Sequence, residues 1–179
     1  VHTGSCGKIS REEALVLAID TMKLSQKALD DEGLSDIHIC PETMGKVNQL
    51  GTLHEVLELC KIDERIIPTL DFGHINSFGL GSLKSEDDFR QVFMTLKKYI
   101  GDRYKNVHIH FSKIMFGDKG ELKHLTFDDN EGFGPDFEPL AKVLKELDIN
   151  AVIICESRGT QTKDAVKMKN IFKQTIDLV

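Results

Sequence analysis

A short pattern that repeats along this chain restricts its fold more than any other feature. Residues 66–74 read Ile-Ile-Pro-Thr-Leu-Asp-Phe-Gly-His, so Asp71 closes an apolar run and His74 follows one short loop later. An apolar run that ends abruptly in an acid is typical of a buried parallel strand, which delivers polar side chains at its carboxyl end. The run therefore predicts one strand of a parallel sheet with a polar rim.

Four more segments have the same form, and helical patterns separate most of them. They are residues 1–5 with His2, residues 37–42 ending in Glu42, residues 107–111 with His108 and His110, and residues 151–156 ending in Glu156. Helices are predicted over residues 10–29, 52–59, 85–100, 137–147 and 162–176. The first two begin with capping boxes, in which a hydroxyl residue precedes a glutamate by three positions. Residues 72–83 and 112–135 are predicted to be loops.

Strands that alternate with helices predict parallel strands joined by right-handed crossovers, in either an open doubly wound sheet or a barrel. Side chains of a strand alternate between its faces, so Asp71 shares a face with Thr69, whereas Leu70 lies on the other. One polar and one apolar face favour the (β/α)8 TIM barrel, whose active site lies at the carboxyl rim. Because such barrels have about 250 residues, we expect residues 1–179 to be a single α/β domain holding the last five of eight units.

Composition excludes few classes of function. The chain is 40% hydrophobic, which suffices for one core, and its net charge of −6 opposes a non-specific coat of nucleic acid. A local site in which metal ions carry the positive charge is still compatible with that balance. No apolar run reaches the roughly 20 residues of a membrane span, and the four scattered cysteines are typical of buried thiols in a reducing compartment. We therefore expect a cytoplasmic protein without a membrane partner.

Histidine and carboxylate side chains at one rim predict a metal centre, because imidazole nitrogen and carboxylate oxygen are ligands of zinc and similar ions. Asp71 has the alternative role of capping a helix, and His110 is as well suited to substrate contact as to ligation. Lys113 and Arg158 could each hold a phosphate or simply be charges on the rim. The candidate metal ligands are His2, Glu42, Asp71, His74, His108, His124 and Glu156.

Six motifs together resemble the endonuclease IV family, which comprises TIM-barrel AP endonucleases that use three zinc ions and cleave DNA 5′ to abasic sites. The motifs are Val-His-Thr-Gly-Ser at residues 1–5, Pro-Glu-Thr-Met-Gly at 41–45, Leu-Asp-Phe-Gly-His at 70–74, Val-His-Ile-His-Phe at 107–111, Lys-His-Leu-Thr-Phe at 123–127 and Ile-Cys-Glu at 154–156.

The resemblance implies three metal positions. Glu42, Asp71, His108 and Glu156 match the ligands of one zinc ion, and Glu42 bridges to a second ion that His2 also binds. His74 and His124 match ligands of the third ion. The chain departs from the family two residues before His124, where Leu122 replaces an aspartate and Glu121 is the adjacent carboxylate. It also has His110 and a phenylalanine where the family has Asn-Asp.

The sequence thus predicts an AP endonuclease that acts on double-stranded DNA with an abasic site, using two or three zinc ions, with manganese as the alternative. Glu42 and Glu156 are the predicted catalytic residues, and Lys113, Arg158 and His110 the predicted substrate contacts. The second hypothesis is a sugar isomerase or epimerase of the xylose-isomerase-like class, which needs only one ion. The third is a non-catalytic module without metal. Unpaired strand edges also predict self-association of the isolated chain.

Overall fold

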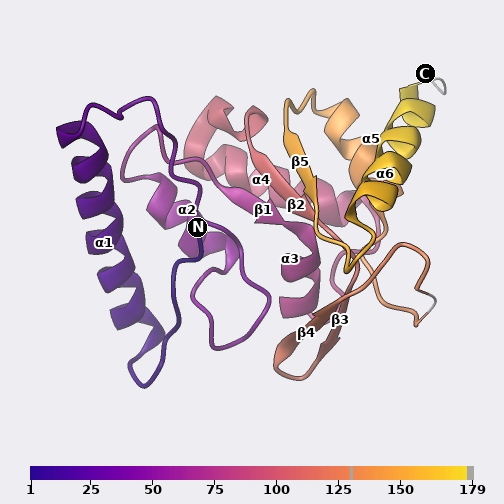
Figure 1. The fold of residues 1–179 in the computed structure, drawn as a ribbon, viewed down its shortest axis with the longest axis horizontal. Coiled ribbons are helices and arrows are strands. Elements are labelled where there is room, and N and C mark those ends of the chain that lie inside the picture. Colours follow the sequence, from indigo (N-terminus) through magenta and orange to yellow (C-terminus); the bar gives the residue numbers. More distant parts are fainter. Residues whose placement is uncertain (130, 177–179) are drawn as a thin grey trace.

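The computed structural model describes residues 1–129 and 131–176, and its helices and strands follow the predicted alternation (Figure 1). The strands are β1 (Thr69–Asp71), β2 (His108–Phe111), β3 (Ile114–Gly117), β4 (Gly120–His124) and β5 (Val152–Cys155). The α-helices are α1 (Arg11–Asp31), α2 (Leu53–Cys60), α3 (Phe72–Phe78), α4 (Glu86–Ile100), α5 (Phe137–Glu146) and α6 (Gln161–Ile176), and a 3₁₀-helix spans Gly101–Lys105.

The predicted parallel sheet is present, with β2 between β1 and β5. Its register pairs Asp71 with His110, and His110 in turn with Ile154. The segment before Glu42 is not a regular strand, but it runs beside β1: Glu42 forms a parallel bridge with Thr69, and its amide donates to the carbonyl of Val1 at 3.0 Å. The five predicted strand ends therefore lie side by side in order, although two of them make too few ladder hydrogen bonds to form regular strands.

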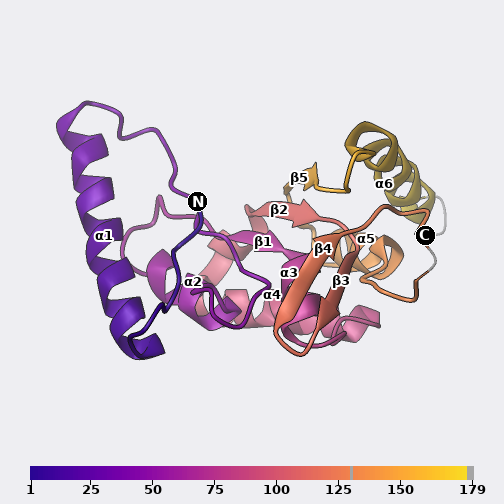
Figure 2. The same ribbon diagram turned by 60° about the horizontal axis from the view of Figure 1, so that its bottom comes forward.

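The two faces of the sheet differ as side-chain alternation predicts. Leu70, Ile109 and Phe111 are completely buried in a core to which α2, α4, α5 and α6 contribute. Figure 2 shows α2, α4 and α5 along the lower side of β1 and β2. The opposite face carries Asp71 and His110 at its carboxyl end. The apolar face holds the helices, so the polar face remains available for a site.

The capping boxes are confirmed. The side chains of Ser10 and Thr52 each accept a hydrogen bond from the amide three residues later. The side chains of Glu13 and Glu55 in turn accept from the backbone amides of Ser10 and Thr52. The prediction of a loop over residues 72–83 is wrong in its first half, where α3 forms. The reason is Asp71, whose Oδ1 accepts from the amide of His74 at 2.8 Å and so caps a helix directly after the strand.

The predicted long loop over residues 112–135 contains an antiparallel hairpin of β3 and β4. The sequence pattern does not indicate this hairpin because both strands are short. Gly120, with φ of +87°, begins β4 directly after the turn. An added Cβ at Gly120 would lie 2.0 Å from the carbonyl oxygen of Gly45, so the hairpin packs tightly on the loop after Glu42. The hairpin thereby carries His124 to the rim of the sheet.

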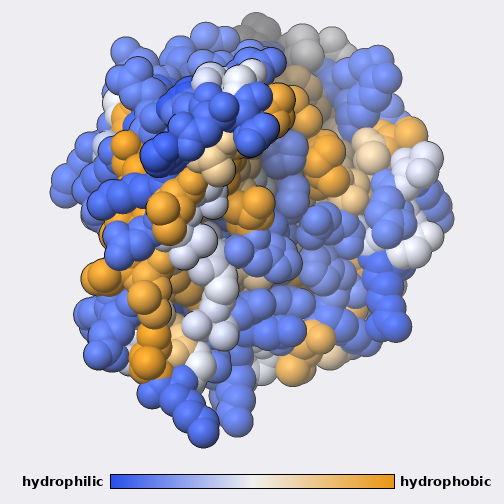
Figure 3. All heavy atoms as spheres, turned by 60° about the vertical axis from the view of Figure 1, so that its left-hand side comes forward, coloured by the Kyte–Doolittle hydropathy of each residue, from blue (hydrophilic) through white to orange (hydrophobic). Residues whose placement is uncertain are grey.

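Helix α1 stands apart at one side of the molecule (Figures 1 and 2). A cavity of about 850 Å³ separates it from the first five residues and residues 37–40. Figure 3 views this side and shows apolar side chains gathered on it. Leu17 and Ile37 line the cavity and are about half exposed. None of the described helices is long and apolar enough to cross a membrane.

Candidate metal centre

The first group of candidate ligands consists of Glu42, Asp71, His110 and Glu156. One ligand atom from each lies within 4.8 Å of those of the others. Nδ1 of His110 is 3.1 Å from Oε1 of Glu42 and 3.2 Å from Oε1 of Glu156. Three carboxylates and one imidazole thus converge from four separate segments at the carboxyl rim.

Asp71 provides the test of whether a cation fits there. Its side chain is fully buried, and while Oδ1 caps α3, Oδ2 makes no hydrogen bond among the described residues and lies 3.4 Å from Nδ1 of His74. Burial raises the pKa of Asp71 to about 6, with the charges of Glu156 and Glu42 acting in the same direction against the opposing influence of His74. A buried carboxylate oxygen that no hydrogen bond satisfies, beside two further carboxylates, is an arrangement that a divalent cation would satisfy.

The structure places the two histidines of β2 differently from the predicted ligand set. His110, rather than His108, joins Glu42, Asp71 and Glu156, because His110 is in register with Asp71 at the end of the strand. His108 is paired with Thr69, one pleat deeper, and its ring packs edge-on against that of His110 at a centroid distance of 5.2 Å. Both histidines share one face, so side-chain alternation alone could not distinguish them.

Hydrogen bonds and neighbouring charges shift the pKa values of the first group. Burial disfavours the charged form of Glu42, but the hydrogen bond with His110 and the charges of His110, His74 and His2 lower its pKa. Burial likewise opposes protonation of His110, whereas Glu42, Glu156 and Asp71 raise its pKa. These contacts therefore keep the side chains of Glu42, His110 and Glu156 together at the rim.

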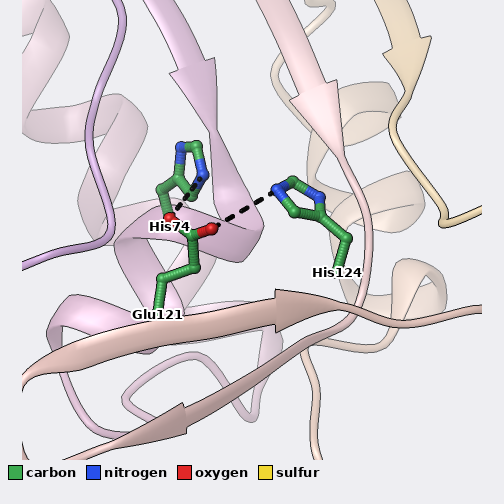
Figure 4. A group of neighbouring side chains, drawn as sticks. All are labelled: His74, Glu121 and His124. Carbon is green, nitrogen blue, oxygen red and sulfur yellow. Dashed lines mark ion pairs between the residues drawn. The ribbon is translucent and has the colours of Figure 1, made fainter.

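A second group lies beside the first and comprises His74, Glu121 and His124 (Figure 4). Nε2 of His74 is 3.4 Å from Oε2 of Glu121, and Nε2 of His124 is 3.8 Å from Oε1. The two imidazole rings meet edge to face at 5.5 Å. Burial disfavours the charged form of His74, but Asp71, Glu121 and Glu42 together raise its pKa to about 9. His74 also connects the groups, since Nδ1 lies 3.5 Å from Oε1 of Glu42.

Glu121 enters this group through an irregularity that the sequence does not reveal. The hairpin pairs Met115 with Lys123 but Phe116 with Glu121, so Leu122 is an extra residue on β4. Such a bulge shifts the alternation of side chains and re-aims a residue. Leu122 is accordingly exposed, whereas Glu121 faces the two histidines. The bulge thus places the carboxylate of Glu121, rather than the side chain at position 122, beside the two histidines.

The other candidates lie at varied positions. His2 is largely exposed, with Nε2 3.4 Å from Oε2 of Glu42. Lys113 does not join either group: it pairs with Asp136 at 3.0 Å and lines a cavity of about 600 Å³ that no member of the two groups lines. Arg158 is exposed on the loop after Glu156 and has no ion-pair partner in the part of the chain that the structure describes.

Parallel strands with helices on one face and a cluster of oxygen and nitrogen ligands at their carboxyl ends define a metal-binding α/β protein of the TIM-barrel type. The model of the xylose isomerase-like TIM barrel family, which is also named for AP endonucleases, matches residues 1–177. The chain therefore belongs to this family.

The chain is also similar to two known proteins. The uncharacterized protein MJ0133 of Methanocaldococcus jannaschii is 33% identical over 147 residues, which cover 80% of this chain and 52% of the relative. A crystal structure of the IOLI protein with a bound zinc atom has a TM-score of 0.60 and 18% identity, covering 97% of this chain and 58% of the other. At that identity the second likeness shows the fold alone. The chain spans between half and three fifths of the length of these relatives.

Proposed function

We propose that this chain carries the metal-binding rim of an AP endonuclease that hydrolyses the DNA backbone 5′ to abasic sites. The observation that carries the proposal is the second ligand group beside the first. Hydrolysis of a phosphodiester benefits from adjacent cations, which together activate a water molecule and stabilise the departing oxygen. The substrate is double-stranded DNA with an abasic site, and the cofactor is zinc, in two or three ions, with manganese as the alternative.

The residues have separate roles in this proposal. Glu42, Asp71, His110 and Glu156 hold one cation, and His74, Glu121 and His124 hold another. Glu42 also lies between His2 and His110, at 3.4 and 3.1 Å, so its two oxygens face different sides. A carboxylate in that position can serve two cations at once.

Glu156 and Arg158 are suited to the substrate side of the rim. The side chain of Glu156 is 31% exposed, against 6% for Glu42 and none for Asp71, so Glu156 is the carboxylate most accessible to a water molecule. It can accept a proton from that water as a general base. The guanidinium of Arg158, on the same loop, can form paired hydrogen bonds with a phosphate.

A second candidate function is isomerisation or epimerisation of a sugar. The observation that favours it is that the first group is complete without the second: four ligands suffice for one divalent ion. On this hypothesis His74, Glu121 and His124 form an ion-pair network that stabilises the hairpin.

The intact protein, loaded with zinc or manganese, should be incubated with a labelled duplex that contains one abasic site, and metal content should be measured in parallel. We expect cleavage 5′ to the lesion and more than one ion per chain. Glu156→Gln should reduce cleavage at least about 100-fold, the lower range of general acid–base effects. The matched control is Glu146→Gln, which alters a surface glutamate that pairs with Arg90 at 2.6 Å. One ion per chain with sugar turnover and intact DNA would favour the isomerase instead.

A further inference from the structure

Ser112 follows β2 and continues the inward face that carries His108 and His110, since alternate residues of a strand share a face. Its side chain is completely buried, and Oγ lies 2.9 Å from Nδ1 of His124. The backbone of Ser112 is held in place as well, because an added Cβ on Gly73 of α3 would lie 2.7 Å from the Ser112 carbonyl oxygen. The hydroxyl therefore meets the imidazole from a fixed position.

The other imidazole of the second group is held in a corresponding way. Nδ1 of His74 lies 2.9 Å from the carbonyl oxygen of Thr43. A carbonyl can only accept, so this nitrogen carries the proton of the bond. Nε2 of His74 is thereby directed to Glu121, at 3.4 Å. Fixing one ring nitrogen by a hydrogen bond selects which nitrogen is left for a ligand.

We propose that Ser112 is a positioning residue of the second group: its hydroxyl, hydrogen-bonded to Nδ1 of His124, holds the ring with Nε2 directed between Glu121 and His74, and it can accept the Nδ1 proton when Nε2 binds a cation. β2 then serves both groups, through His110 in the first and Ser112 in the second. The metal-binding consequence rests on the proposed function, whereas the choice of tautomer does not.

The chain offers a matched control for removal of this hydroxyl. Ser77 on α3 is equally buried, but its Oγ bonds to the carbonyl oxygens of His74, at 3.0 Å, and of Gly45, at 3.5 Å, rather than to an imidazole. Ser77→Ala therefore removes a buried hydroxyl near the site without releasing a ring. Ser112→Thr keeps the hydroxyl and serves as the conservative variant, and thermal unfolding of each variant reports whether it folds.

The first measurement is the tautomer of His124 in the metal-free chain, read from nitrogen–proton correlations of labelled imidazoles. We expect a single tautomer in the wild type and Ser77→Ala, and a mixture of forms in Ser112→Ala. The second is zinc affinity in competition with a chromophoric chelator. Ser112→Ala should weaken the second ion about 10- to 100-fold and leave the first unchanged, and Ser112→Thr should restore binding.

The Ser112 assignment is overturned if Ser112→Ala keeps the single tautomer of the wild type, or if Ser77→Ala also gives a mixture of tautomers. A wild type that binds a single ion contradicts the hydrolase proposal instead. The tautomer measurement needs neither metal nor turnover, so it decides the role of Ser112 in that case too.

Discussion

The carboxyl rim of the sheet and the cavity beside α1 distribute polar and apolar groups in opposite ways. At the rim, Asp71, Glu42 and His74 are charged or polar side chains that are almost wholly buried. Beside α1, Leu17 and Ile37 are apolar side chains that are about half exposed around a cavity of about 850 Å³. Each region thus departs from the usual preference of its residues for the interior or the surface.

The two departures have different physical meanings. Burying carboxylates costs free energy unless opposite charge or hydrogen bonds compensate, and the rim retains them in an arrangement that a cation would complete. Exposed apolar surface forgoes roughly 25 cal/mol for each Å² that could be buried, which matters when net stability is only about 5–15 kcal/mol. The rim therefore has the composition of a cation site, whereas covering the apolar side chains beside the cavity would add stability.

The largest effect should come from Asp71 at the rim. Asp71→Asn keeps an oxygen to cap α3 but removes the negative charge, so the affinity of the first group for a metal ion should fall strongly. Because a bound metal is worth several kcal/mol to such reactions, activity should fall at least about 1000-fold. Zinc should raise the melting temperature of the wild type by more than that of the variant, which keeps only the second group intact. Near-normal turnover in Asp71→Asn would show that the metal centre lies elsewhere.

The second test separates the bulge residue from its neighbour. Glu121→Gln should weaken the second ion by more than about tenfold, because an amide cannot neutralise a cation as a carboxylate does. Leu122→Ala is the matched control and should leave metal binding unchanged, since Leu122 is 62% exposed. Chelator competition on both variants provides the measurement. Equal binding by Glu121→Gln and the wild type would remove Glu121 from the ligand set.

A third test concerns how α1 is attached beside the cavity. Arg11 on α1 pairs with Glu55 on α2 through two contacts of 2.5 and 2.9 Å, and Glu55 also accepts from the amides of Gly51 and Thr52. Glu55→Gln should lower the free energy of unfolding by about 2 kcal/mol at neutral pH. Denaturant unfolding at several pH values would measure this difference.

The pH dependence of that difference follows from the pKa of Glu55. Burial alone would raise it, but the hydrogen bonds with Arg11, Gly51 and Thr52 lower it below the ordinary value of 4.5. A lowered pKa in the folded state means that the charged form stabilises the fold above pH 4.5. The stabilisation is lost as the pH falls through the folded-state pKa, so variant and wild type should converge in acid. A constant difference at all pH values would contradict the ion-pair account.

The smallest effect on stability, but a clear one on association, is expected from the apolar cavity side. Leu17→Lys replaces an exposed leucine that lines the cavity and should change unfolding free energy by no more than about 0.5 kcal/mol. We expect the isolated chain to self-associate in sedimentation velocity and the variant to be more monomeric. Lys23→Ala, elsewhere on α1, is the control. A wild-type chain that sediments as a monomer at all concentrations would contradict this expectation.

Local sequence patterns determined much of this fold, because they depend on interactions over a few residues. Ser10 and Thr52, each three residues before a glutamate, located the starts of α1 and α2. Apolar runs that end in Asp71 or Glu156 located β1 and β5, and alternation along them assigned the polar and apolar faces. The presence of Glu42, Asp71 and Glu156 at one rim followed from parallel strand order alone.

Tertiary structure decided which of several equivalent residues reaches the site. His108 and His110 share a face, and only the register of β2 against β1 brings His110 level with Asp71. Glu121 faces His74 because a bulge at Leu122 reverses the alternation of β4, and a bulge depends on how two strands pair. Pairing between distant segments has no signature within either segment, so the sequence determined which residue types lie at the rim, and the fold determined which of them meet there.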